Sequence, residues 1–384
     1  MHRSKLLRRA QAALLGILTC AGPLSLSAAE WDSIVGSVGE MASPGEHWFS
    51  ARGRHIAYLI DGDEGEVRGT LTLSMFTPAI RPHLGSNRIF AYGSYYSRTY
   101  YGDRTDIVTT YDVKTMQPGV EVEIPPKSAG IGHSGMIGLI KDRFLGVWNI
   151  TPGMSVSIVD TQANTFVGEI STPGCAAVYP VDGGFLMPCG DGTLQYIGLD
   201  DTGKETSRTR SDTFFAINDD PVYDYAVPTA TGWLFVSFNG QVYEATWDGS
   251  TISVSAPWSI HDADEEDDDP TDTKGYRIGG SQPFAYNAAT GVLATLMHQG
   301  GGQETFEDGG TEIWAFNTRT RRRGYVLELG DDAKAGGLQF TSDAKPLLLV
   351  SPSGHESLRI YDGMTGHLMH EMDQMRVRML QPLQ

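Results

Sequence analysis

RTDIVTTYDVKTMQPGVEVEIP, residues 104–125, predicts a β-hairpin. Its first strand is expected over 106–111 and its second strand ends at Pro125, because β-branched and aromatic residues favour extended backbone. The turn between them begins at Asp112, whose side chain can accept hydrogen bonds from backbone N–H groups further along the turn. One hairpin cannot bury its apolar face alone, so this segment indicates a fold only if it recurs.

The same strand–turn–strand pattern occurs seven times along the chain. Each copy carries an acidic or amide residue at its turn, and successive copies are 51, 48, 40, 48, 69 and 45 residues apart. The turn residues are Asp61, Asp112, Asp160, Asp200, Asp248, Asn317 and Asp362. A period of about 40–50 residues is typical of a β-propeller, with one four-stranded blade per repeat. The sequence therefore predicts an all-β, seven-bladed β-propeller in which this turn joins the two outer strands of each blade.

Short apolar segments between the turns predict the inner strands of the blades, which are buried on both faces. They are 88–92, 143–150, 184–187, 233–238, 292–297 and 346–351. No long amphipathic helical period interrupts them. We therefore expect a single propeller domain over residues 30–384.

Residues 1–29 predict a cleaved secretory signal peptide. A basic start is followed by a short apolar segment, 12–18, and by small residues at 27–29 that suit cleavage before Glu30. The apolar segment is too short to span a bilayer comfortably. Cleavage removes four basic and no acidic residues, which takes the net charge from −18 to about −22. Lipidation of Cys20 is the alternative, although Thr19 suits it poorly; in either case we expect export.

Cys175 and Cys189 are the only thiols left after that cleavage. An oxidising compartment favours their pairing, and the turn 182–184 midway between them would bring the two ends of a hairpin together. A redox-active pair is the alternative. It lacks the Cys-x-x-Cys spacing and has no charged neighbour in the sequence to lower a thiol pKa. We therefore expect a structural disulfide.

The charge pattern bears on possible partners. A net charge of −18 argues against nucleic acid, because phosphate binding needs a basic surface. The longest interval between turns contains an insertion at about 261–275, with eight acidic residues in the run 262–272, DADEEDDDPTD. Like charges repel, so a solvated loop is expected. A calcium site or a docking loop for a basic partner are the alternatives, and the run lacks the EF-hand spacing.

The sequence contains no recognisable catalytic constellation. The G-x-G-x-x-G match at 130–135 precedes strand-like residues and not a helix, so phosphate binding is not expected. The histidines show no metal-ligand spacing, and no metal site is expected on this chain. Aromatic clusters at 47–49, 95–96, 100–101 and 223–225 indicate packing between blades, an apolar channel or a protein interface. The residues alone thus indicate either a propeller that binds another molecule or one subunit of an enzyme.

Residues 100–125, YYGDRTDIVTTYDVKTMQPGVEVEIP, resemble a blade of the heavy (large) subunit of the quinoprotein amine dehydrogenases, the methylamine and aromatic amine enzymes. The likeness extends in order over about residues 45–375. It includes 58–62 with Gly65 and Gly69, Gly174-Cys175 with Pro180 and 185–194, 279–286, 310–314, 345–348 and 358–366. In the family, the segment 174–194 corresponds to a disulfide-bearing hairpin.

The resemblance implies a periplasmic oxidoreductase subunit that has no catalytic residue and no cofactor of its own. In such enzymes a small, disulfide-rich light subunit carries tryptophan tryptophylquinone and oxidises primary amines to aldehyde and ammonia. Electrons then pass to a blue-copper protein, and two heavy and two light subunits assemble. The heavy subunit docks the light subunit and helps to shape the amine channel, and no membrane span is implied.

The resemblance also implies channel residues near the N-terminal blade. His47, Trp48 and Phe49 are the nearest match to the family's His-Phe pair, and Phe49 is the candidate for an apolar channel wall. Two other functions stay open on the sequence: a non-enzymatic periplasmic propeller that serves as a binding scaffold, and a metal- or pyrroloquinoline-quinone-dependent propeller enzyme.

Overall fold

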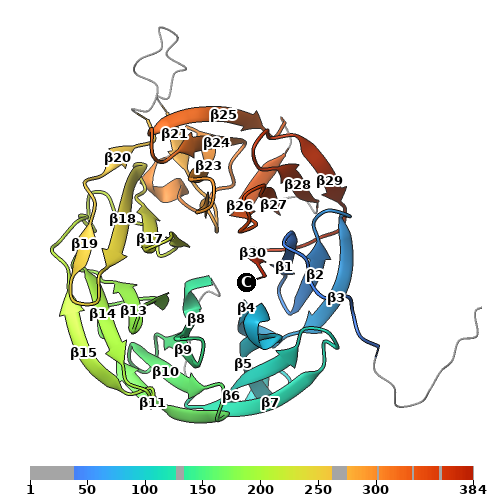
Figure 1. Cartoon of the computed structure of the whole chain (residues 1–384), viewed down its shortest axis with the longest axis vertical. Coiled ribbons are helices and arrows are strands. Elements are labelled where there is room, and N and C mark those ends of the chain that lie inside the picture. Colours follow the sequence, from blue (N-terminus) through green and yellow to red (C-terminus); the bar gives the residue numbers. More distant parts are fainter. Residues whose placement is uncertain are drawn as a thin grey trace, which may run out of the picture. The chain divides into compact units, whose positions relative to one another are not determined.

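Seven antiparallel sheets stand in a ring within the unit Glu40–Gln384, each sheet forming one blade (Figure 1). This computed structural model describes residues 39–126, 134–261, 275–300, 302–330, 333–353 and 357–383. The all-β, seven-bladed propeller predicted from the repeats is confirmed. The signal peptide 1–29, Cys20, most of the G-x-G-x-x-G segment and the acidic run 262–272 lie outside the described residues.

The blades follow one another along the chain, and the first blade also takes in the C-terminal strand. Blade 1 contains β1 (Trp48–Arg52), β2 (Ile56–Asp61), β3 (Glu66–Thr72) and β30 (Met379–Pro382). Blade 2 contains β4 (Phe76–His83), β5 (Arg88–Arg98), β6 (Tyr101–Asp112) and β7 (Pro118–Ile124). Blade 3 contains β8 (Ile137–Ile140), β9 (Phe144–Asn149), β10 (Ser155–Asp160) and β11 (Thr165–Ser171). Blade 4 contains β12 (Tyr179–Val181), β13 (Gly184–Pro188), β14 (Leu194–Leu199) and β15 (Glu205–Arg210).

Two of the remaining three blades have a fifth strand. Blade 5 contains β16 (Val227–Pro228), β17 (Gly232–Val236), β18 (Gln241–Trp247), β19 (Ile252–Val254) and β20 (Trp258–Ser259). Blade 6 contains β21 (Tyr276–Ile278), β22 (Phe284–Asn287), β23 (Val292–Gln299), β24 (Glu312–Asn317) and β25 (Arg322–Glu328). Blade 7 contains β26 (Lys334–Phe340), β27 (Leu347–Ser353), β28 (Leu358–Asp362) and β29 (Leu368–Met372). Within the described ranges, no helix is both long and apolar enough to cross a membrane.

The repeated turn residue connects the two outer strands in all seven blades, as predicted. Its side-chain oxygen accepts backbone N–H groups two and three residues further on, or two and four at Asp200. At Asp112, the N–H of Thr115 donates at 2.8 Å and that of Lys114 at 2.9 Å. These bonds, led by the one from Thr115, hold the pKa of Asp112 below its usual range. The turn's backbone N–H groups have no partner on a neighbouring strand. A short side chain that carries an acceptor oxygen, Asp or Asn, is therefore needed at this position.

The innermost strands differ from the prediction. The six apolar segments expected to be inner strands form the second strand from the channel in blades 2 to 7, and β9 and β13 are buried at every residue. A further strand lies inside each of them, and β16 has only two residues and β12 three. Each of these short strands has one edge paired within its blade and the other edge facing the central channel. They carry too few residues for a period of two to show in the sequence.

The apolar core lies between neighbouring blades, and every blade contributes a phenylalanine to it. Each ring is at most 1% exposed: Phe49, Phe90, Phe144, Phe185, Phe235, Phe284 and Phe340. Burying one such ring contributes about 2–3 kcal/mol. The blades therefore stabilise one another around the ring, and no blade buries its own faces alone.

The ring is closed by pairing of the two chain ends. β30 pairs antiparallel with β1, from Phe49 opposite Pro382 to Arg52 opposite Met379. Leu380 donates its backbone N–H to Gln282 Oε1 at 2.6 Å and accepts from Gln282 Nε2 at 3.0 Å. The Gln282 side chain, which is buried, thereby ties blade 6 to the closing strand of blade 1.

Candidate functional site

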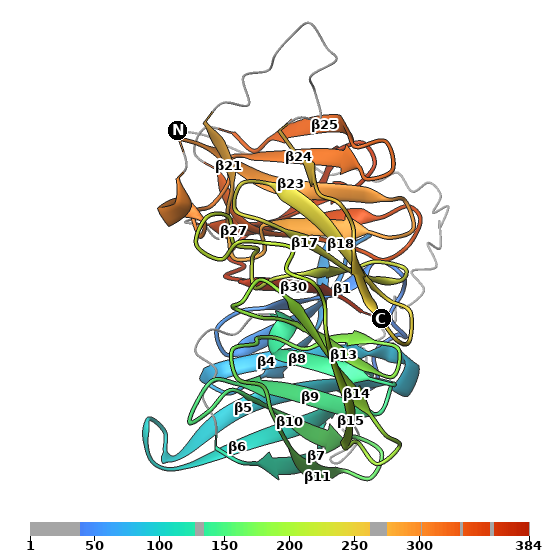
Figure 2. The ribbon, with the colours of Figure 1, turned by 90° about the vertical axis from the view of Figure 1, so that its left-hand side faces the viewer.

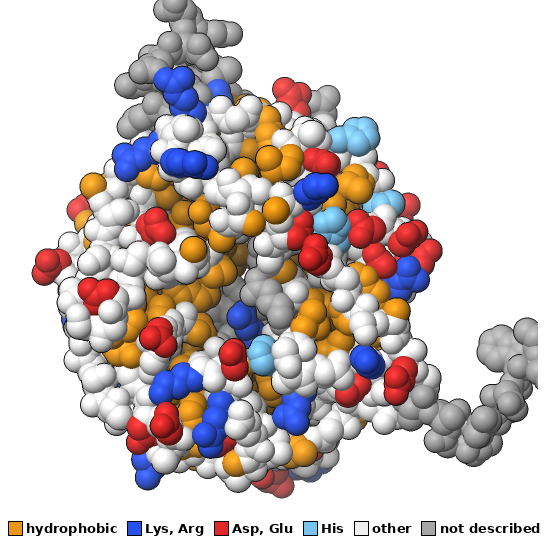
Figure 3. All heavy atoms as spheres, in the orientation of Figure 1, with side chains coloured by type: hydrophobic (Ala, Val, Ile, Leu, Met, Phe, Trp, Pro, Cys, Tyr) orange, Lys and Arg blue, Asp and Glu red, His pale blue; other side chains and the backbone are white. Residues whose placement is uncertain are grey.

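A cavity of about 710 Å³, counting its open mouth, occupies the centre of the ring. The innermost strand of every blade contributes to its wall: Arg81 and Pro82, Ile137, Tyr179 and Pro180, Val227 and Pro228, Tyr286, Gln339 and Phe340, and Gln381 and Pro382. The centre of the ring is visibly hollowed, with apolar side chains along much of the wall (Figure 3). Among the described side chains that line this cavity, Arg81 is the only charged one.

The three residues predicted to line an amine channel lie at the start of blade 1, outside the wall of the central cavity. Phe49 is 0% exposed and belongs to the same core cluster as Ile60 and Leu347. Trp48 is buried in a second cluster with Leu59. Both aromatic rings therefore pack inside this chain. Their assignment to an amine channel stays a prediction.

His47 is the member of this trio that reaches the surface. Its Nδ1 lies 2.6 Å from Asp63 Oδ1, and its Nε2 lies 3.3 Å from Asp343 Oδ1. Burial alone would lower the pKa of His47, but the hydrogen bond to Asp63 and the charge of Asp343 raise it above its ordinary value. Asp343 comes from blade 7, so this cluster crosses the boundary between the last and first blades.

The aromatic clusters divide into a buried pair and an exposed group. Tyr223 and Tyr225 are 4% and 3% exposed, and Tyr223 OH donates to Ile278 O at 2.8 Å. For these two, packing between blades is the observed arrangement. Tyr100 and Tyr101, by contrast, are 63% and 62% exposed.

The exposed group lies on an extension of blade 2 that we call the aromatic arm, residues 94–106. Strands β5 and β6, with 11 and 12 residues, carry it beyond the neighbouring strands (Figure 2). The ring of Phe76 contacts Tyr96 and Tyr100 edge-on, at centroid distances of 5.0 and 6.2 Å. The guanidinium of Arg98 stacks 4.7 Å above the ring of Tyr101. The arm is thus an ordered aromatic surface on two paired strands.

A buried ion pair fixes the base of the aromatic arm. The Asp106 side chain is 0% exposed and accepts from Arg104 Nε at 2.6 Å and Nη2 at 2.7 Å. Tyr92 OH donates to the same carboxylate at 3.0 Å. Burial, followed by the charge of Asp106, raises the pKa of Tyr92 to about 12. Arg104 and Tyr92 thus hold a carboxylate that has no exposed surface of its own.

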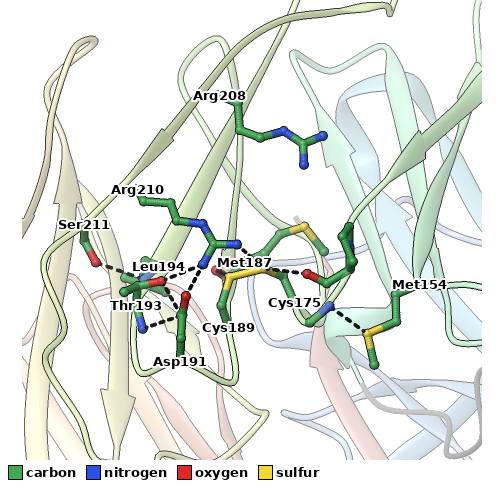
Figure 4. Close-up of a disulfide and its surroundings, with 12 residues drawn as sticks. Met154, Cys175, Met187, Cys189, Asp191, Thr193, Leu194, Arg208, Arg210 and Ser211 are labelled. Atoms are coloured by element: carbon green, nitrogen blue, oxygen red, sulfur yellow. Dashed lines mark hydrogen bonds and ion pairs between the residues drawn. A yellow bond between two sulfur atoms is a disulfide. The ribbon is translucent and has the colours of Figure 1, made fainter.

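The predicted disulfide between Cys175 and Cys189 is present in blade 4 (Figure 4). The two residues form an isolated antiparallel bridge, and Trp148 Nε1 donates to Cys175 O at 3.2 Å. Arg210 Nη2 lies 3.6 Å from Cys175 Sγ, and its Nη1 pairs with Asp191. A charged group therefore does lie beside the sulfur, although the sequence showed no charged neighbour of either cysteine. It comes from strand β15, which only folding brings there.

Replacing both cysteines (Cys175→Ser/Cys189→Ser) is expected to lower the free energy of unfolding by about 3 kcal/mol, because the crosslink closes a loop of about 15 residues. Urea denaturation of the oxidised proteins measures this loss. As a control, a reducing agent should shift the wild-type midpoint toward that of the variant and leave the variant unchanged. An unchanged midpoint in the variant would contradict a stabilising role.

The structure assembles no evident metal site in the ranges it describes. No three His, Cys, Asp or Glu side chains gather there as ligands of one ion would. The acidic run 262–272, for which a calcium site was an alternative, lies outside those ranges. The chemistry that the described residues offer is thus packing, docking and one cation on the wall of the central cavity.

Fold and site together define a closed seven-bladed propeller with a cavity at its axis and an aromatic arm on one blade. The family model for the methylamine dehydrogenase heavy chain matches residues 45–379, and the chain belongs to this family. The resemblance seen in the sequence is therefore confirmed.

Curated relatives agree with this assignment, and solved structures share the fold. The methylamine dehydrogenase heavy chain of Paracoccus versutus is 26% identical over 325 residues, which cover 83% of this chain and 73% of the relative. That of Methylorubrum extorquens is 25% identical, covering 83% and 76%. The periplasmic gluconolactonase PpgL of Pseudomonas aeruginosa shares the fold with a TM-score of 0.58 at 15% identity, over 87% of this chain and 98% of that one. The dihydro-haem d1 dehydrogenase NirN does so with a TM-score of 0.55 at 16% identity, over 90% and 77%. At these identities, the two solved structures show the fold alone.

Proposed function

We propose that this chain is the heavy subunit of a periplasmic amine dehydrogenase and carries no catalytic residue. Its light subunit holds tryptophan tryptophylquinone and oxidises primary amines to aldehyde and ammonia, with electrons passing to a blue-copper protein. Two heavy and two light subunits form the assembly. The family match over residues 45–379, which spans all seven blades, is the observation that carries the proposal.

The charge of the chain fits a subunit that serves amine oxidation. Primary amines are mostly alkylammonium cations at neutral pH, and a net charge of −18 raises their concentration near the protein surface. His47 lies between two carboxylates at the surface of blade 1, while Trp48 and Phe49 pack beneath it. We propose these three residues as this chain's share of the amine channel, with the buried rings holding His47 in place.

We propose the aromatic arm as the surface that docks the light subunit. Tyrosine and arginine are enriched where proteins bind one another, and the arm exposes both. The ion pair at its base holds the arm in one position, so that little conformational entropy is lost on binding. A small partner chain can reach this surface because the arm extends past the neighbouring strands.

Purification of the tagged chain from its native host tests the proposed function. A small cysteine-rich chain should co-purify in equal amount, and intact mass spectrometry should find on it the mass of a crosslinked, oxygenated tryptophan pair. Recovery of this chain alone, at several salt concentrations, would favour the binding-scaffold alternative and sink the proposal.

The double variant Tyr100→Ser/Tyr101→Ser is expected to weaken light-subunit binding at least tenfold, since it removes two exposed aromatic rings of the kind that dominate interfaces. Titration of the isolated subunits, read by light scattering or calorimetry, measures the effect. The control variant Val326→Ser/Met364→Ser removes exposed apolar side chains on blades 6 and 7 and should bind as wild type does. Equal binding by both variants would place the docking surface elsewhere on this chain.

A further inference from the structure

Arg81 is a cation without a counter-ion in the central cavity. It lies in β4, the innermost strand of blade 2, and its side chain lines the cavity. In the described part of the chain, no hydrogen bond or ion pair joins its guanidinium. Burial lowers the pKa of Arg81, and the charge of Asp142 only partly opposes this. The Asp142 side chain is itself 87% exposed and lies 3.6 Å from His83 Nε2.

Two carboxamides line the same cavity with unused hydrogen-bonding capacity. Gln381 is 5% exposed, and its Oε1 has no hydrogen-bond partner. Gln339 Oε1 accepts its neighbour's N–H from Phe340, which leaves the Gln339 NH₂ group without a partner in the described residues. A carboxamide can turn over and present either its oxygen or its NH₂ group, so both residues can donate to a ligand. The wall thus offers one cation and two donors, and no carboxylate among its described residues.

This combination favours a bound anion on energetic grounds. Arg81 is half-buried, and a partly desolvated charge is costly unless it is paired. The surrounding wall of Val178, Tyr179 and Phe340 supplies little compensation. A guanidinium presents parallel N–H donors that match the two oxygens of a carboxylate. The overall charge of −18 repels anions at long range, but at physiological ionic strength that repulsion is screened beyond about 8 Å. Inside the cavity, the nearby guanidinium decides the sign of the potential.

We propose that the central cavity binds one small carboxylate anion, held by the guanidinium of Arg81 and by the amides of Gln381 and Gln339. The site does not depend on the light subunit, because all of its residues belong to this chain. The anion joins the innermost strands of three blades, β4 of blade 2, β26 of blade 7 and β30 of blade 1. Its binding therefore stabilises the closed ring as well as neutralising Arg81.

Equilibrium dialysis of the full-length secreted chain against radiolabelled acetate tests the proposal. About one acetate per chain should bind saturably in a background of sodium chloride at constant ionic strength. Unlabelled phosphate serves as a second probe, and weaker competition by it than by unlabelled acetate is expected for a carboxylate site. Absence of saturable acetate binding would overturn the proposal.

Variants assign the binding to Arg81. Arg81→Gln should raise the Kd for acetate at least tenfold, and Arg81→Lys, which keeps the charge but loses the paired donors, should raise it less. The matched control, Arg319→Gln, changes an exposed arginine on the Asn317 turn and should leave the Kd unchanged. Should Arg81→Gln fail to fold, Gln381→Leu replaces it, with a rise in Kd expected. Unchanged acetate binding in a folded Arg81→Gln or Gln381→Leu variant would overturn the proposal.

Discussion

A chain that ends at Arg378 is expected to lose its closed ring and most of its stability. It lacks β30 and Leu383, and with them three buried apolar side chains, those of Met379, Leu380 and Leu383. At about 2 kcal/mol for each, their burial alone approaches the whole net stability of a typical protein, about 5–15 kcal/mol. The buried amide of Gln282 also loses both of its bonds to Leu380, at a further cost of about 1–3 kcal/mol.

Thermal melts followed by circular dichroism measure this effect. We expect the shortened chain to be insoluble, or to melt at least 15 °C below the full chain. A chain that ends at Leu383 keeps β30 whole and is the matched control, with a melt like that of the full chain. A cooperative melt of the chain ending at Arg378 within 2 °C of the full chain would show that strand pairing at the chain ends does not hold the ring.

The second large effect is expected at the base of the aromatic arm. Asp106→Ala leaves the guanidinium of Arg104 and the hydroxyl of Tyr92 without their shared acceptor. The Arg104 side chain is 24% exposed and can regain water, so the cost falls mainly on the buried hydroxyl of Tyr92 and is about 1–3 kcal/mol. Since the arm begins at this site, its position should loosen as well, and the affinity for the light subunit should fall.

Urea denaturation and light-subunit titration together check this expectation. Asp103→Ala is the matched control: Asp103 lies at the exposed part of the same arm, and its loss should change stability by less than about 0.5 kcal/mol. Proteolysis offers an independent readout, since the loosened arm should be cut between Arg98 and Arg104 sooner than in the wild type. Equal stability of Asp106→Ala and Asp103→Ala would contradict a fixed arm.

The parts of the fold that could be predicted from the sequence are those determined by contacts between residues close together in the chain. Each Asp or Asn turn is decided within four residues, because its side chain binds backbone N–H groups next to it in the chain. Seven such turns at a regular spacing are enough to count the blades. The disulfide followed similarly from two cysteines at the ends of one hairpin.

The parts that sequence missed depend on residues far apart in the chain. Gln282 and Leu380 are separated by 98 positions, and Arg210 and Cys175 by 35, so no local pattern connects either pair. The aromatic arm carries tyrosine pairs at 95–96 and 100–101, but no local pattern shows that β5 and β6 stay paired across them. Arg81 lies in β4, but its place in the cavity depends on innermost strands of all seven blades that come together only in the closed ring.

The most direct test of the proposed function is amine oxidation by the complex and by its parts. Purified from its native host, the assembly should reduce an artificial electron acceptor when methylamine or another primary amine is added, and it should show a quinone absorption band. This chain alone should do neither, and adding back the small chain should restore both. Amine oxidation by this chain in isolation, or an active assembly without a quinone-bearing small chain, would contradict the account.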